Sequence, residues 1–411
     1  MRMKLVLCGV IAAAAICAAQ SAHAAVAPWW SVQSVDTMKY SRDASREALH
    51  NQSFDAIIEK QMKQIASTGA THVAIATPYD EEFYPVLKRW ADSARRHGLS
   101  VWFRGNWSGW EKWFEYTAIT RVQHLQKTKD FLQKHGDLFQ DGDIFTACPE
   151  CENGGPGDPR ATGDVAGYRA FVIEEYAATK AAFAAMHKDV ASNWQSMNAD
   201  VARTVMDPAT TKAMDGLVVI DHYVKDPAQI ARDVEAIAKE SGGMVALGEF
   251  GAPIPDIHGQ MTEAQQAQWI DTALKNLLTA KHLVGISYWV NVGGSTKLWT
   301  DNGTAREAVV ILKKYYSPQT VHGLVQGVFH SGVSGAIITS SEGRVATTDA
   351  RGFFAIPYID AKNTVFTIKE PSYSPATLSR DQIASGPIIL QVQGFLSRIW
   401  LNIQYLIGLV T

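Results

Sequence analysis

From residue 30 to about residue 316, short apolar runs alternate with longer segments whose apolar residues recur at helical spacing. The apolar runs that we expect to be strands cover residues 31–35, 72–76, 100–104, 143–147, 190–193, 217–220, 244–248 and 285–290. Strands that alternate with amphipathic helices are typical of βα units and a parallel sheet. Eight such units over this length predict a (β/α)8 TIM barrel. An open doubly wound sheet is disfavoured, because no glycine-rich phosphate loop follows the first strand.

The pattern changes after residue 316. Ser317-Pro318 ends the last helical segment, and short strands separated by glycine-containing turns follow at close spacing. This spacing predicts a small all-β sandwich over residues 317–394. The segment resembles the carboxypeptidase regulatory-like sandwiches through Gly327, Gly335-Ala336, the turn from Thr348-Asp349 to Gly352-Phe353, and Tyr373. The resemblance implies a spacer or docking module and indicates no chemistry.

The two ends of the chain have their own patterns. Residues 1–24 combine a basic start, an apolar run and Ala22-His23-Ala24, which predicts a secretory signal peptide cut after Ala24. The barrel would then cover residues 25–316, in an exported protein that is periplasmic or secreted. Residues 395–411 are mostly apolar but short for a membrane span. This tail is expected to pack on the sandwich, or to contact a membrane surface or a partner protein peripherally.

Charge and composition narrow the choice of ligand. The formal net charge is -3 and basic residues are scattered among acidic ones, so nucleic acid is not an expected partner. The histidines show no metal-ligand spacing, and we expect neither a metal nor a cofactor. Several of the twelve tryptophans fall near predicted strand ends. Because flat rings with a polar edge suit the faces of sugars, a carbohydrate is the expected substrate.

Carboxylates follow two of the predicted strands. Glu249 ends the apolar run at 244–248, and Glu150 and Glu152 follow the run at 143–147. In a barrel, the residues at the C-terminal ends of the strands form the active site. Two carboxyl groups that face each other there can break a glycosidic bond, because one protonates the leaving oxygen while the other attacks the anomeric carbon.

At these positions the chain resembles the retaining (β/α)8 glycoside hydrolases of clan A, whose acid/base glutamate follows the fourth strand and whose nucleophilic glutamate ends the seventh. The resemblance implies that Glu249 is the nucleophile and that Glu150, or alternatively Glu152, is the acid/base. The clan's acid usually follows an asparagine, whereas here Pro149 precedes Glu150 and Asn153 comes after Glu152. The choice between the two glutamates therefore stays open.

The same resemblance implies substrate-binding residues. Tyr223 and His222 follow the sixth predicted strand, where the clan's tyrosine steadies the nucleophile, and Trp289 matches the aromatic platform under the sugar. Further hydroxyl donors and stacking surfaces are expected from residues after the third, fourth and fifth predicted strands: Arg104, Trp107, Asn153, Asn193 and Trp194. Arg104 could replace the arginine that commonly follows the second strand in the clan.

Cys148 and Cys151 enclose Glu150 and are the cysteines that remain after the expected signal peptide. Two cysteines cannot make a four-cysteine zinc site within one chain. They could form a local disulfide that stiffens the loop, or remain two buried thiols.

These patterns together predict an exported retaining glycoside hydrolase that cleaves O-glycosidic bonds of a poly- or oligosaccharide. Action within a chain is favoured over trimming of its ends, because aromatic loops on several strand ends would make a groove with several subsites. The alternatives are a non-catalytic carbohydrate-binding or scaffold protein of an exopolysaccharide or cell-envelope system, and a barrel hydrolase or lyase of different chemistry.

Overall fold

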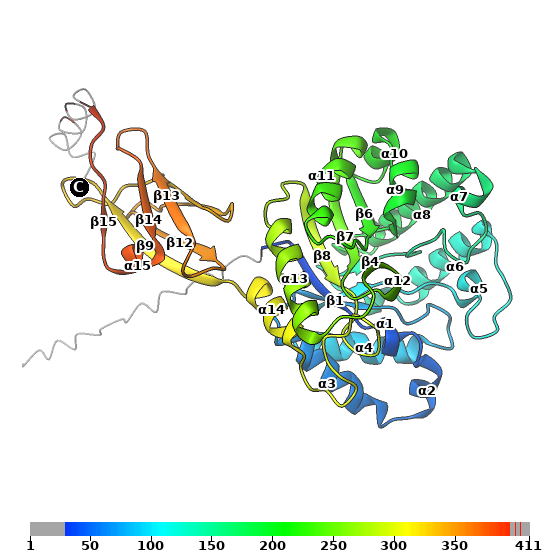
Figure 1. Ribbon diagram of the computed structural model, residues 1–411. Coiled ribbons are helices and arrows are strands. Elements are labelled where there is room, and N and C mark those ends of the chain that lie inside the picture. The colour runs from blue at the N-terminus through cyan, green and yellow to red at the C-terminus, as the bar shows by residue number, and fades with distance from the viewer. Residues whose placement is uncertain (1–28, 395–398, 400–402, 404–411) are drawn as a thin grey trace, which may run out of the picture.

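The computed structural model describes residues 29–394 together with Ile399 and Ile403. The predicted signal peptide, and the predicted tail apart from these two isoleucines, lie outside the described residues. A helix-covered barrel comes first along the chain and a smaller β domain follows it (Figure 1). Within the described part of the chain, no helix is both long and apolar enough to cross a bilayer.

Eight parallel strands form the barrel: β1 (Val32–Asp36), β2 (His72–Ile75), β3 (Ser100–Phe103), β4 (Ile144–Phe145), β5 (Ser196–Asn198), β6 (Leu217–Asp221), β7 (Met244–Phe250) and β8 (Leu283–Tyr288). Their order is β4-β3-β2-β1-β8-β7-β6-β5. The ring closes where Ile144 pairs in parallel with Ala191, a few residues before β5. The predicted barrel is confirmed.

The predicted position of the fifth strand, residues 190–193, is wrong. Ala191 pairs with β4, but β5 itself is Ser196–Asn198, which pairs with β6. The inward Ser196 hydroxyl accepts a hydrogen bond from Arg104. An apolar pattern cannot reveal this strand, because its interior position is polar.

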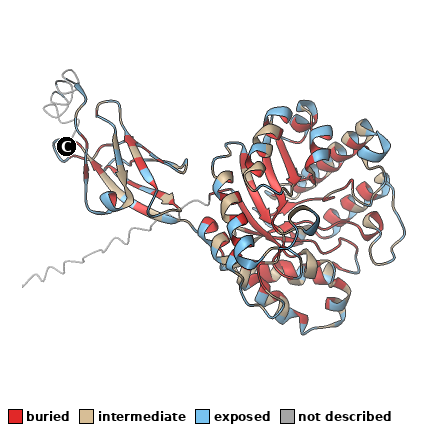
Figure 2. Ribbon diagram, in the orientation of Figure 1, coloured by how far each residue is buried: buried red, intermediate tan, exposed pale blue. Residues whose placement is uncertain are grey.

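Helices cover the outside of the sheet and bury apolar faces against it (Figure 2). For example, α4 buries Val86, Leu87 and Trp90, and each such side chain contributes about 1.5–3 kcal/mol. The helical segments are α1 (Met38–Ser41), α2 (Ser45–His50), α3 (Phe54–Ala66), α4 (Tyr84–Arg96), α5 (Ser108–Glu111), α6 (Arg121–Lys134), the 3-10 helix η1 (Gly136–Leu138), α7 (Pro159–Thr162), α8 (Val165–Ala185), α9 (Ala199–Val205), α10 (Pro208–Ala213), α11 (Gln229–Ser241), α12 (Pro255–His258), α13 (Glu263–Leu277) and α14 (Glu307–Tyr316).

The inside of the barrel changes from apolar to polar along its axis. Seven strand residues and Trp194, which precedes β5, form an apolar floor: Val32, Ala74, Trp102, Ile144, Trp194, Leu217, Val219 and Ala246. Nearer the C-terminal ends, Asp36, Arg104, Asp221 and Glu249 are buried instead. Buried charges are costly in free energy unless they are paired, so this polar end of the barrel is the candidate functional site.

The C-terminal β domain has two antiparallel-rich sheets. One has the order β11-β10-β13-β14 and the other the order β12-β9-β15. Its elements are β9 (Gln319–Gln326), β10 (Ile337–Ser340), β11 (Val345–Thr347), β12 (Phe353–Tyr358), β13 (Val365–Lys369), β14 (Ala376–Ser379), α15 (Arg380–Ala384) and β15 (Ile388–Ile389). Val325, Ile338, Ile356 and Phe366 are fully buried in its core. The predicted small all-β domain is confirmed, and its resemblance to carboxypeptidase regulatory-like domains stays a prediction.

Candidate active site

Arg104, directly after β3, joins side chains from four other strands at the C-terminal end of the barrel. Its Nη1 lies 2.9 Å from Oε1 of Glu249 and 3.2 Å from Oδ2 of Asp36. Its Nη2 lies 2.9 Å from Oδ2 of Asp221 and 3.0 Å from Oγ of Ser196. The guanidinium is only 1 % exposed. One buried cation therefore holds three carboxylates together.

A local irregularity between β6 and β7 directs Glu249 into this cluster. The register shifts after Ile220, so that Asp221 lies opposite Glu249 and Gly248 is left as the extra residue. A Cβ at Gly248 would lie 2.3 Å from Oδ1 of Asp221. Glycine is therefore required before Glu249, because any side chain would displace the neighbouring carboxylate.

Tyr223 and Trp289 lie beside Glu249. The Tyr223 hydroxyl donates to Oε2 of Glu249 at 2.7 Å, and the Tyr223 and Trp289 rings meet edge to face at 6.2 Å. Burial, with the negative charge of Glu249, raises the pKa of Tyr223 well above its usual value, so the phenol stays protonated and donates. Trp289 is half-buried, and its buried Nε1 has no hydrogen-bond partner among the described residues.

The His222 ring faces away from this cluster. Its Nε2 lies 2.8 Å from Oδ2 of Asp233 on α11, while its backbone amide donates to the carbonyl of Glu249. The imidazole joins β6 to the helix layer and is not part of the cluster. The expected contact between His222 and substrate stays a prediction.

Glu150 lies in a short loop that a Cys148–Cys151 disulfide closes, so of the two alternatives for the cysteines the structure has the disulfide. The Glu150 backbone has φ of 45° and its amide donates to the carbonyl of Ser196 at 2.8 Å. The Glu150 side chain is half-buried, and its carboxyl group forms no hydrogen bond with the described residues. Burial, with the negative charges of Asp221 and Glu249, raises the pKa of Glu150 well above its usual value.

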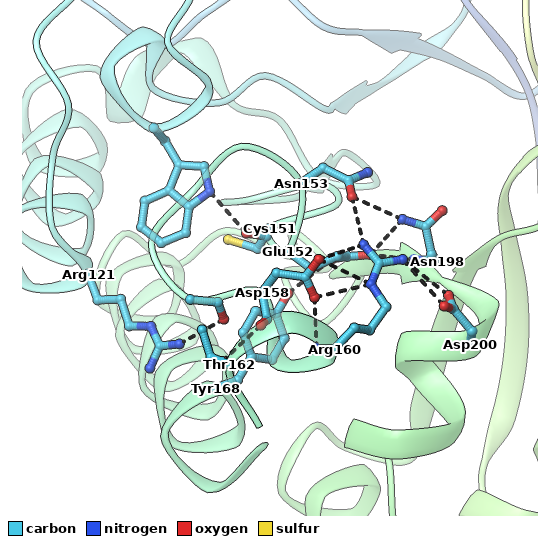
Figure 3. Close-up of polar contacts among 12 residues, drawn as sticks. Arg121, Cys151, Glu152, Asn153, Asp158, Arg160, Thr162, Tyr168, Asn198 and Asp200 are labelled. Atoms are coloured by element: carbon cyan, nitrogen blue, oxygen red, sulfur yellow. Dashed lines mark hydrogen bonds and ion pairs between the residues drawn. The ribbon is translucent and has the colours of Figure 1, made fainter. Parts of the chain in front are cut away.

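Glu152 is held on both of its oxygens (Figure 3). Oε1 accepts from the backbone and side-chain amides of Asn198, at 2.6 and 2.9 Å, and Oε2 accepts from the Tyr168 hydroxyl at 3.1 Å. The residue is 2 % exposed. Burial raises the pKa of Glu152, and these hydrogen bonds oppose that rise. Of the two loop glutamates, Glu150 therefore has the carboxyl group that is open to a substrate.

Asn153 lies on the rim of the same loop. Its Oδ1 accepts from Nη2 of Arg160 at 3.1 Å and from Nδ2 of Asn198 at 3.4 Å (Figure 3). Arg160 is also paired with Asp158 and Asp200. Asn153 is half-buried at this edge and ties the loop that carries Glu150 to the end of β5.

Three other predicted substrate-binding residues lie outside the cluster around Arg104. Trp107 is buried, donates through Nε1 to Thr128 on α6, and packs in the helix layer. Trp194 belongs to the apolar barrel floor, and Asn193 donates to the Met214 carbonyl just before β6. Because β5 begins after residues 193 and 194, both lie toward the N-terminal end of the barrel.

Sequence reasoning missed four residues of the site: Asp36, Asp221, Ser196 and Asn198. Asp36 and Asp221 each end an apolar strand, so the rule that drew attention to Glu249 could have found them. Ser196 and Asn198 lay beyond the misplaced fifth strand and carried no recognisable signal.

Ligand atoms of His124, Cys148 and Cys151 lie within 4.8 Å of one another. The two sulfurs are bonded to each other, so this group offers a metal only the imidazole. Both ring nitrogens of His124 are also engaged, with Glu175 and Asn106. The group does not have the deprotonated thiolates that a zinc site needs.

Replacing Asp36 with asparagine is expected to change how stability depends on pH. Burial raises the pKa of Asp36 from 3.8 to about 6, with the charge of Glu249 adding to the rise and that of Arg104 opposing it. A raised carboxyl pKa gives stability that is full below pH 3.8 and is lost as pH rises through about 6. The free energy of unfolding of the wild type, relative to Asp36→Asn, should fall by about 3 kcal/mol between these limits. Urea unfolding at pH 4 and pH 7 measures this, and a constant difference would contradict it.

No protein-family model and no curated protein matches the chain. Solved structures do match. A GH5_18 variant from Bifidobacterium longum subsp. longum, in complex with Manβ1-4GlcNAc, has a TM-score of 0.53 and 14% identity over 88% of this chain and 90% of its own. A second GH5_18 structure from the same organism has a TM-score of 0.52 and 15% identity over 72% and 83%. The chain has the fold of these glycoside hydrolases. At this identity the likeness concerns the fold alone.

Proposed function

We propose that the protein is a retaining glycoside hydrolase that cleaves O-glycosidic bonds of a poly- or oligosaccharide. The observation that carries this proposal is the difference between two carboxyl groups at the barrel mouth. Glu249 receives hydrogen bonds from Arg104 and Tyr223, whereas the Glu150 carboxyl group receives none from the described residues and burial raises its pKa. This difference suits Glu249 to the role of nucleophile and Glu150 to the role of acid.

In the proposed first step, the Glu249 carboxylate attacks the anomeric carbon while Glu150 protonates the leaving oxygen, so the glycosidic bond breaks and a glycosyl ester forms. In the second step, the Glu150 carboxylate takes a proton from water, and the water oxygen displaces Glu249. Arg104 and Tyr223 hold the nucleophile in place. Trp289 offers the partly exposed ring beside them on which a sugar can stack.

Replacing Glu150 with glutamine tests the acid. For glycosides with poor leaving groups, kcat/KM should fall by about 10²–10⁴-fold, because the departing oxygen is no longer protonated. For a dinitrophenyl glycoside, whose leaving group needs no proton, the first step should be nearly unaffected. Steady-state and burst kinetics over a series of aryl glycosides measure the difference.

Glu152→Gln is the matched control. Any fall in its kcat/KM should be the same for good and poor leaving groups, because both Glu152 oxygens already accept hydrogen bonds from Asn198 and Tyr168. If the leaving-group dependence appeared in Glu152→Gln and not in Glu150→Gln, the acid assignment would be reversed.

The proposal includes export and cleavage within a chain. The signal-peptide pattern and the disulfide both fit a protein outside the cytoplasm. Among the tryptophans of the described barrel loops, Trp113 and Trp289 are half-buried and the others are buried, so the aromatic surface is smaller than the sequence suggested. The sizes of products released early from a polysaccharide distinguish internal cleavage from trimming.

A further inference from the structure

The loop of residues 148–154, which carries Glu150, is called the acid loop below. Four polar side chains beside it form a hydrogen-bond network that the proposed mechanism does not use. Glu175 on α8 lies 2.8 Å from Nδ1 of His124 on α6. Nε2 of His124 lies 3.0 Å from Oδ1 of Asn106, which follows β3. Nδ2 of Asn106 donates to Oε1 of Glu111 at 2.9 Å. This hydrogen-bond network therefore extends from the outer helices α6 and α8 to α5 at the barrel mouth.

Three of the four members are fully buried: Glu175, His124 and Asn106. Burying a carboxyl group, an imidazole and an amide costs free energy that hydrogen bonds only partly offset, and Oε2 of Glu175 is left without a partner among the described residues. An apolar contact between these helices would bury the same space at a lower cost in free energy. The network therefore calls for an explanation other than stability.

The network fixes the direction of the Asn106 amide. Oδ1 of Asn106 accepts from His124 and also from the Trp107 backbone amide at 2.8 Å. With both acceptor positions of Oδ1 used, Nδ2 is directed at Glu111. The Glu111 carboxyl group is consequently held in one place by partners that a substrate cannot reach.

Glu111 itself is half-buried at the mouth. Its Oε2 accepts no hydrogen bond from the described residues, and it faces the acid loop so closely that a Cβ at Gly154 would lie 3.3 Å away. Burial raises the pKa of Glu111 to about 7, while Asn106 and the positive charge of Arg42 oppose the rise. The Arg42 guanidinium lies 4.5 Å above the ring of Trp113 and also acts on Asp36.

We propose that Oε2 of Glu111 binds a hydroxyl group of the sugar next to the one whose bond is cleaved, in a second subsite on the β1 and β3 side of the mouth. This inference rests on the proposed function. Arg42 and Trp113 supply a donor and partly exposed aromatic surface, which together with a carboxylate suit a sugar ring. The sugar expected there is neutral, because a uronate would add a third carboxyl group where burial already disfavours the ionised forms of Glu111 and Glu152.

The test compares an aryl monoglycoside, which does not reach the second subsite, with the aryl di- and trisaccharide of the same sugar. In Glu111→Gln, kcat/KM for the longer substrates should fall by about 10–100-fold through KM. Asn106 holds the amide oxygen, so the acceptor at the Oε2 position is replaced by an NH2 donor. Activity on the monoglycoside and covalent labelling by a fluorinated monosaccharide should be unchanged. Glu115→Gln, whose side chain is 85% exposed in the same loop, is the control and should lose nothing.

Equal losses on short and long substrates would overturn the inference, since Glu111 would then act at the reacting bond. An unchanged kcat/KM on both short and long substrates would also overturn the inference, since the network would then have only a structural role. If Glu111→Gln fails to fold, Arg42→Gln should show the same selective loss. Affinity electrophoresis in a neutral polysaccharide gives a readout without turnover. If the wild type cleaves nothing but Glu111→Gln weakens this binding, the proposed function fails and the subsite stands; equal binding would overturn the subsite.

Discussion

Replacing Glu249 with glutamine is expected to lower kcat by about 10⁴-fold or more on every glycoside that the wild type cleaves. The amide cannot form the glycosyl ester, and removing the nucleophile from a covalent mechanism leaves only the rate that binding and orientation supply. The fold should survive, because the amide oxygen can still accept from Arg104 and the amide nitrogen can donate to the Tyr223 hydroxyl oxygen. Single-turnover kinetics on an activated aryl glycoside, with thermal unfolding of both proteins, measures the two expectations.

Glu240→Gln is the matched control, because this glutamate is exposed on α11 and only pairs with Arg203. Its activity should equal that of the wild type. A fluorinated glycoside should label Glu249 in the wild type, and peptide mapping identifies the modified residue. A label on any other residue would show that the nucleophile is assigned incorrectly, and undiminished sugar binding with no turnover in either protein would favour a carbohydrate-binding protein.

Replacing Arg104 with methionine should cause the largest loss of stability, about 3–5 kcal/mol in the free energy of unfolding. The variant leaves Asp36, Asp221 and Glu249 buried together without their cation. Arg104→Lys should recover only part of the loss, because one ammonium cannot reproduce the two-sided fork that contacts Glu249 and Asp221.

The difference in free energy of unfolding between the wild type and Arg104→Met should become smaller at low pH. Without the guanidinium the folded carboxyl groups bind protons more tightly than the unfolded chain does, so stability falls as pH rises. Urea unfolding at pH 5 and pH 7.5 measures the trend. Arg203→Met, which removes a surface arginine paired with Asp233 and Glu240, should cost less than about 1 kcal/mol. If both variants cost the same, the central role of Arg104 is refuted.

The sequence was informative where a polar residue ends an apolar strand. Glu249 was found in this way, and Tyr223 and Trp289 were found through the resemblance to the clan A glycoside hydrolases. The structure brings the three together. It was uninformative where strand interiors are polar, so β5 was misplaced and Asn193 and Trp194 were assigned to the wrong end of the barrel.

Two further questions depended on contacts between distant segments. Neither spacing nor composition distinguishes Glu150 from Glu152; the distinction comes from Asn198 and Tyr168, which occupy Glu152 from other elements. Likewise, a tryptophan after a strand can stack on a sugar or fill the core. Trp107 belongs to the core because Thr128 on α6 accepts its indole hydrogen.

The closure of the barrel has a consequence for the proposed acid. Between β4 and the segment before β5 the sheet pairs through a single bridge, Ile144 with Ala191. Above that seam, the amide of Glu150 bonds to Ser196 and the carboxylate of Glu152 bonds to Asn198. The loop that carries the proposed acid therefore also helps to close the barrel between β4 and β5. A substitution that weakens this closure would displace Glu150 before it displaced Glu249, which lies on β7 across the barrel.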